Sequence, residues 1–159
     1  MNWVGSGTGE MGIALSAAGV AIDGLDLCPR PTTWPHLAEW HRTDIREFNG
    51  YSEYSAVMAN LTLHHFNSSD LAVLGVKLAG ARLIVAYEPL RRRRSQAIFA
   101  AFGLLLGANH ITLHDARFSI AAGFLCDELP HALGLTADRW KWKYEMSLLG
   151  AYRIIARRR

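Results

Sequence analysis

The sequence predicts an α/β fold, with a doubly wound, mostly parallel, seven-stranded Rossmann-like sheet that ends in an antiparallel edge hairpin. A glycine-rich turn opens the chain, between a short apolar segment and a helical pattern, at residues 3–10. Strand-like and helix-like segments then alternate, which is typical of parallel sheets. The last two strand patterns, residues 140–145 and 151–156, are close enough in sequence to pair as a hairpin.

The composition indicates one globular domain that spans residues 1–159. Half of the residues are apolar and 19% are charged, which is ordinary for a domain of this size. The formal net charge of +3 comes from two arginine runs, 91–94 and 157–159, and not from a basic face, so we expect no nucleic-acid partner. The most apolar run, 97–108, is too short to span a bilayer and predicts a buried helix, so we expect no membrane partner. Since the sequence shows no N-terminal signal pattern, we expect a cytoplasmic protein.

The first elements surround the glycine turn. Residues 1–4 form a short first strand, and because so little precedes the turn we expect the chain to begin inside that strand. Residues 10–18 form a helix, and Gly19 stands where a C-terminal cap is expected. Residues 20–26 are a second strand that ends in an acid, and three prolines exclude a regular helix in the segment 28–35.

The middle of the chain continues the alternation. Residues 42–45 are a weak third strand, and the apolar run 54–60 is a fourth strand of the buried parallel kind. Leucines recur at helical spacing in residues 70–79, and Gly80 ends that helix. Residues 81–87 are the fifth strand.

The last part holds the least regular patterns. Residues 95–106 predict a long apolar helix, residues 110–124 a loop rich in His and Asp, and residues 127–133 a short helix. The two cysteines, Cys28 and Cys126, have the spacing of neither a disulfide scaffold nor a zinc site, so we expect no metal.

The glycine turn fits two kinds of cofactor site. Residues 7–12 fit the dinucleotide pattern GxGxxG, and Asp26 lies 19 residues beyond Gly7, near the distance of the ribose-binding acid in NAD sites. Residues 5–9 equally fit GxGxG, the turn used for S-adenosylmethionine. Asp26 is consistent with both interpretations, because a carboxylate at a strand end can accept hydrogen bonds from both hydroxyls of a ribose.

Later residues separate the two interpretations. Residues 5–9, Asp26, Asp44 and the run 60–65, in this order, resemble the class I S-adenosylmethionine-dependent methyltransferases over nearly the whole chain. The segments 26–31, 88–93 and 114–120 look like a bacterial branch that acts on small molecules.

The resemblance implies S-adenosylmethionine as the cofactor. It implies that the glycines line the methionine half, Asp26 the ribose, Asp44 the adenine, and Asn60 the wall beside the methyl group. In full, the implied cofactor-binding residues are Gly5, Ser6, Gly7, Thr8, Gly9, Asp26, Leu27, Asp44, Ile45, Asn60 and Leu61. The family usually has an acid two residues before the first glycine, and here that position is Trp3.

The expected function is methyl transfer from S-adenosylmethionine to a small-molecule acceptor. A hydroxyl or amine acceptor needs a base, and histidine suits that task near neutral pH. We expect His64, after the fourth strand, or His114, beside Asp115, to fill that role. The alternatives are an NAD(P)-binding oxidoreductase and a non-catalytic binding module. The sequence indicates neither the acceptor nor the oligomeric state.

Two further features stay open at this stage. Glu88 closes the fifth strand and either lines a substrate pocket or caps the next turn. The arginines at 91–94 either attract an acidic substrate or form a solvated helix start.

Overall fold

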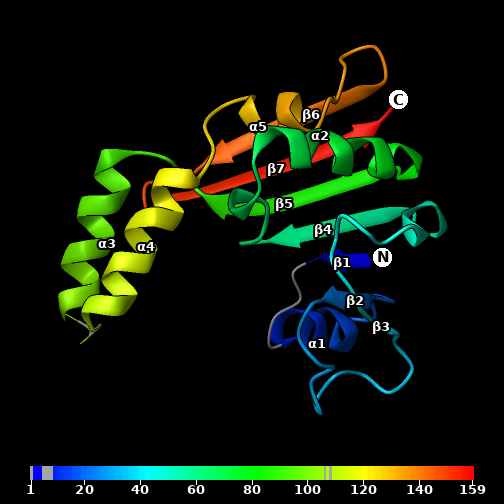
Figure 1. Ribbon diagram of the computed structural model, residues 1–159, viewed down its shortest axis with the longest axis horizontal. Coiled ribbons are helices and arrows are strands. Elements are labelled where there is room, and N and C mark those ends of the chain that lie inside the picture. Colours follow the sequence, from blue (N-terminus) through cyan, green and yellow to red (C-terminus); the bar gives the residue numbers. More distant parts are fainter. Residues whose placement is uncertain (1, 5–8, 106, 108) are drawn as a thin grey trace.

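The computed structural model describes residues 2–4, 9–105, 107 and 109–159. Its strands form one seven-stranded sheet, in the order β3-β2-β1-β4-β5-β7-β6 (Figure 1). Five are mutually parallel: β1 Asn2–Val4, β2 Asp23–Asp26, β3 Trp40–Arg42, β4 Ala56–Asn60 and β5 Leu83–Pro89. The hairpin strands β6 Trp140–Met146 and β7 Ala151–Arg158 complete the sheet, and β7 runs antiparallel to both of its neighbours. The mostly parallel α/β sheet and its edge hairpin are therefore observed.

The strand order reverses between β1 and β4. In the register of the sheet, Val4 faces Leu25 of β2 on one side and Ala59 of β4 on the other. The chain leaves these three strands at the same edge, and in open α/β sheets ligands bind outside the carboxyl ends of the strands at such a switch point. The fold thus brings the residues that follow β1, β2 and β4 to one edge.

Helices connect the strands. They are α1 Glu10–Ala17, α2 Ser68–Lys77, α3 Arg93–Leu105, α4 His110–Ala122 and α5 Glu128–Ala132, with the short 3-10 turns η1 Gly50–Glu53, η2 Leu63–His65 and η3 Leu78–Gly80. Gly19 has a φ of 81° after α1, as expected for its place beyond the helix end. Within the part of the chain that the structure describes, no helix is both long and apolar enough to cross a membrane.

Two predictions about the later helices are wrong. Residues 110–124 were expected to form a loop, but α4 occupies most of them, because the side chain of Asn109 caps its first turn by accepting the N–H of Thr112 at 2.9 Å. The apolar run 97–108 was expected to be buried, yet Ala97, Phe99 and Ala100 of α3 are exposed. The α3–α4 pair extends beyond the carboxyl end of β5 instead of covering the sheet (Figure 1).

Strand boundaries also shift. The second strand begins at Asp23 and not at residue 20, and the third is Trp40–Arg42 and not 42–45. The reason is register, since Gly24 pairs with Trp40 and Asp26 with Arg42, so that β3 ends where β2 ends. Asp44 consequently lies in the turn after β3.

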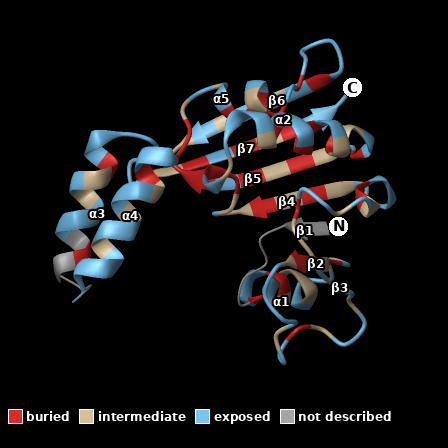
Figure 2. Ribbon diagram, viewed as in Figure 1, coloured by how far each residue is buried: buried red, intermediate tan, exposed pale blue. Residues whose placement is uncertain are grey.

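The core lies between the central strands and the helices that cover them (Figure 2). Buried apolar side chains of β4, β5 and β7 meet Leu71 and Leu74 of α2, each 2% exposed. The close approach of α2 to the end of α5 depends on Gly75, where an added Cβ would lie 1.8 Å from the carbonyl oxygen of Leu133.

Candidate functional site

The glycine turn leads from β1 into α1. Gly5, Ser6, Gly7 and Thr8 lie outside the described residues. Gly9 precedes the helix with a φ of 79°, a left-handed conformation that favours glycine.

The last glycine of the GxGxxG pattern has a packing role in this chain. A Cβ on Gly12 would lie 2.3 Å from Cζ3 of Trp34, a side chain that is 1% exposed. The indole Nε1–H of Trp34 donates to the carbonyl oxygen of Glu39 at 3.1 Å, which fixes the ring against the helix. Because the indole alone requires a glycine here, Gly12 does not by itself indicate a dinucleotide.

Asp26 ends β2 at the ligand edge of the sheet. Its Oδ1 accepts the backbone N–H of Cys28 at 2.9 Å, which orients the carboxylate at the strand end. The same carboxylate raises the pKa of the exposed Cys28 thiol, through a hydrogen bond and its negative charge. The next side chain, Leu27, is 65% exposed. The strand end therefore presents a half-buried carboxylate beside an exposed apolar side chain.

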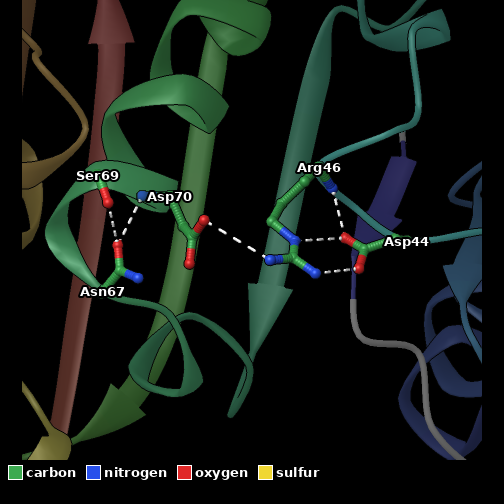
Figure 3. A network of polar contacts seen from close by, with 5 residues as sticks. All are labelled: Asp44, Arg46, Asn67, Ser69 and Asp70. Atoms are coloured by element: carbon green, nitrogen blue, oxygen red, sulfur yellow. Dashed lines mark hydrogen bonds and ion pairs between the residues drawn. The ribbon is translucent and has the colours of Figure 1, made fainter.

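Asp44 is held by an arginine (Figure 3). Its Oδ1 accepts Nε–H of Arg46 at 3.0 Å and its Oδ2 accepts Nη2–H at 2.6 Å. Arg46 also lies 3.6 Å from Oδ1 of Asp70 in α2, and its guanidinium lies over the ring of Phe66. The hydrogen bonds from Arg46 hold the pKa of Asp44 below its usual range. Arg46 therefore joins the turn after β3 to the start of α2, and Asp44 holds that guanidinium in place. The neighbouring Ile45 is buried in the core.

Asn60 and Leu61 follow β4 at the same edge. Asn60 pairs with Tyr87 of β5, and the N–H of Leu61 donates to the carbonyl oxygen of Tyr87 at 2.8 Å. Leu61 has a φ of 52°, which is unusual for a leucine, and its side chain is 49% exposed.

Glu88 of β5 holds the loop that follows Leu61. Its carboxylate is fully buried, and Oε1 accepts the N–H groups of Thr62 at 3.1 Å and Leu63 at 2.9 Å. Oε2 lies 2.7 Å from Nδ1 of His64, whose side chain is 3% exposed. Glu88 thus caps the η2 turn, and sequence reasoning did not reveal its link to His64 because the two residues lie 24 positions apart in the chain.

The two histidines expected to act as bases have different surroundings. The ring of His64 packs against that of His65 with 4.0 Å between centroids, and burial together with His64 lowers the pKa of His65. His114 lies on α4 with its side chain 69% exposed and its Nδ1 3.8 Å from Asp115. It packs on the ring of Phe118, 4.6 Å away, and lines a groove between α3 and α4.

A cavity of about 300 Å³ lies at the carboxyl end of β5, next to Leu61. Most of its wall is apolar, and the side chains come from strand ends, from both projecting helices and from the β6–β7 turn. They include Leu61, Tyr87, Phe99, Ile120 and Leu149, with Ser95, Ser119 and the buried Glu88 as polar groups. Among the described residues, no three His, Cys, Asp or Glu side chains gather as a metal site.

Comparison with known proteins supports the fold assignment. No protein-family model matches the sequence, and no curated protein matches it significantly. Among solved structures, the plantazolicin methyltransferase BamL, in complex with a triazolic desmethylPZN analog and SAH, superposes with a TM-score of 0.73. It is 10% identical, and the match covers 99% of this chain and 76% of that one.

Other solved structures match over nearly the whole chain. Magnesium protoporphyrin IX methyltransferase (ChlM) from Synechocystis PCC 6803, with bound SAH, has a TM-score of 0.60 at 15% identity, over 99% of this chain and 73% of that one. A putative Zn-dependent alcohol dehydrogenase from Rhodobacter sphaeroides has a TM-score of 0.61 at 10% identity, over 99% and 83% of the chains. Methyltransferases dominate these matches, so the chain has the class I S-adenosylmethionine-dependent methyltransferase fold.

Proposed function

We propose that this protein transfers a methyl group from S-adenosylmethionine to a small-molecule acceptor. The observation that carries the proposal is that the ends of β1, β2 and β4 meet at the switch point of the sheet, directly beside the apolar cavity at Leu61. Leu61 thus links the edge of the sheet where the cofactor is proposed to bind with a cavity of the size of a small acceptor.

Two of the described residues support this cofactor. Gly9 adopts the left-handed conformation that a close backbone turn needs, and Asp26 presents an oriented carboxylate to a ribose. In the proposal the methionine half lies on Gly5, Ser6, Gly7, Thr8 and Gly9, the ribose on Asp26 and Leu27, the adenine at Asp44 and Ile45, and the methyl group near Asn60 and Leu61. When bound, S-adenosylmethionine supplies a methyl group already activated on its sulfonium sulfur.

The protein's own contribution is placement and proton removal. Apolar walls exclude water and hold the acceptor in line with the methyl group, which lowers the barrier by orientation. His64 is the first candidate base of the proposal. Its Nδ1 lies 2.7 Å from Oε2 of Glu88, so its Nε2 would take the proton, although the side chain is 3% exposed and is not among the described residues of the cavity wall. His114 is the second candidate base, since it is exposed on the groove that adjoins the cavity.

Calorimetric titration with S-adenosylhomocysteine, with NAD as the control ligand, tests the proposal. We expect S-adenosylhomocysteine alone to bind. Asp26→Ala should weaken it by about tenfold or more, because the ribose loses a charged hydrogen-bond partner. Asp138→Ala, an exposed acid in the turn before β6, is the matched control. Unchanged affinity in a folded Asp26→Ala protein, shown by circular dichroism, would remove the assignment.

The same titration examines the two other functions. An NAD(P)-binding oxidoreductase is favoured by the GxGxxG spacing and by the dehydrogenase among the structural matches, and it predicts binding of NAD. A non-catalytic module is favoured by Trp3 at the position where the family usually has an acid, and it predicts that a folded protein binds neither ligand.

A further inference from the structure

The α3–α4 pair exposes several large apolar side chains. Phe99 is 41% exposed, Ile111 58% and Phe118 62%. Figure 2 shows that most of both helices is exposed, in contrast with the central strands. Of these side chains, Phe99 lines a groove between the two helices, and apolar side chains exposed in a groove are typical of ligand or partner sites.

A groove of about 780 Å³ runs between the two helices. Its apolar wall includes Phe99, Leu113 and Ile120, and Arg93 and Arg117 line it from opposite helices. Arg91 forms an ion pair with Glu128, whereas no carboxylate of the described residues is ion-paired with Arg93 or Arg117. Residues 90–124 contain five arginines and a single acid, Asp115, so the groove combines apolar walls with a positive charge.

The groove adjoins the cavity of the proposed active site. Phe99 and Ile120 line both the groove and the cavity beside Leu61. A ligand that packs on these two side chains therefore has Leu61 in the wall of the cavity on one side and Arg93 and Arg117 in the wall of the groove on the other. Guanidinium groups bind carboxylates, sulfonates and phosphates through paired hydrogen bonds.

We infer that the acceptor is an amphiphilic anion, with an apolar body that packs on Phe99 and Ile120 and an acidic group bound by Arg93 and Arg117. That this ligand is the methyl acceptor rests on the proposed function. The groove as a site for such a ligand stands on its own geometry.

The probe is 2-naphthoate, with 2-naphthylmethanol as its neutral counterpart, and equilibrium dialysis measures their binding to the full chain. We expect naphthoate to bind more tightly than the alcohol. Arg93→Gln and Arg117→Gln should each weaken naphthoate binding by about tenfold, the loss expected for one charge-assisted hydrogen bond, and leave the alcohol unaffected. Arg94→Gln is the matched control, because Arg94 is an exposed neighbour on α3 that does not line the groove.

Equal binding of the two probes, equal effects of Arg93→Gln and Arg94→Gln, or no naphthoate binding would each overturn the inference. Sedimentation with phosphatidylglycerol vesicles in place of naphthoate binding would assign the surface to a lipid bilayer and would also overturn it. Each variant is also titrated with S-adenosylhomocysteine, whose affinity should not change. If the unaltered protein fails to bind S-adenosylhomocysteine, the proposed function fails, while the naphthoate comparison still decides the groove.

Discussion

Glu88 is the residue whose removal should disturb the candidate site most. Its carboxylate is fully buried and satisfies the N–H groups of Thr62 and Leu63 and the imidazole of His64. Glu88→Ala leaves these buried donors without an acceptor, at about 1–3 kcal/mol for each group left unpaired. Summed over these three groups, we expect a loss of at least about 3 kcal/mol in the free energy of unfolding.

Glu88→Gln separates the backbone contacts from the charge. Its amide oxygen can still accept the N–H groups of Thr62 and Leu63, so we expect a smaller loss, about 1–3 kcal/mol. Urea unfolding at neutral pH measures both variants. Glu145→Ala serves as the control, because Glu145 is a solvent-facing partner of Arg153 and Lys143 and its removal should change stability little. A loss below about 1 kcal/mol in Glu88→Ala would refute the view that this carboxylate holds the loop after β4.

Three further predictions concern packing and pH. Gly75→Ala should lower the free energy of unfolding by about 1–3 kcal/mol, because the backbone of Leu133 must move. Gly80→Ala is the control and should be tolerated, since its added Cβ would lie 3.5 Å from Cα of Ser52; equal urea midpoints of the two variants would contradict this. Gly12→Ala should destabilise by a similar amount, about 1–3 kcal/mol, and Gly12→Ala combined with Trp34→Leu should recover part of that loss, as thermal unfolding of the single and double variants will show. The folded-state pKa of Asp44 lies below its usual 3.8, so its stabilising contribution is present above pH 3.8 and is lost as the pH falls through the folded-state pKa. The stability of the Asp44→Asn protein should therefore fall less steeply with decreasing pH than that of the unaltered protein. Urea midpoints of the two proteins that fall in parallel between about pH 6 and 3 would contradict this.

The sheet could be predicted from the sequence because its signals are local. Apolar runs mark β4 and β5, the latter between Gly80 and Pro89, and alternating patterns on both sides of residues 147–150 mark the hairpin. Parallel strands bring their carboxyl ends to one edge regardless of side-chain detail. Asp26 and Asn60 accordingly lie at the ends of β2 and β4, as expected. Their roles toward a cofactor stay predictions.

The misses arise where a distant or weak contact decides the structure. The cap at Asn109 converts a segment rich in His and Asp into α4, although its apolar pattern is weak. The apolar run in α3 predicts a face that packs against another surface. The sequence does not indicate whether that surface belongs to the sheet, to α4 or to a ligand. Arg46 likewise binds Asp44 two positions away, and the expected strand 42–45, which ends before Arg46, did not indicate this pairing.

Glu88 also explains why the cofactor edge and the cavity belong to one unit. The residue lies in β5 and lines the cavity, yet its hydrogen bonds fix the turn that follows Leu61, next to the proposed methyl group. The strained φ of 52° at Leu61 persists because two successive backbone N–H groups are held. The N–H of Leu61 donates to the carbonyl oxygen of Tyr87, and the N–H of Thr62 donates to Glu88. If Glu88 positions Leu61 in this way, Glu88→Ala should weaken S-adenosylhomocysteine and naphthoate binding together. Glu88→Gln, which keeps both backbone contacts, should weaken them less, and Arg93→Gln should weaken only naphthoate binding. A folded Glu88→Ala protein that binds both ligands with unchanged affinity would show that the edge and the cavity are held independently.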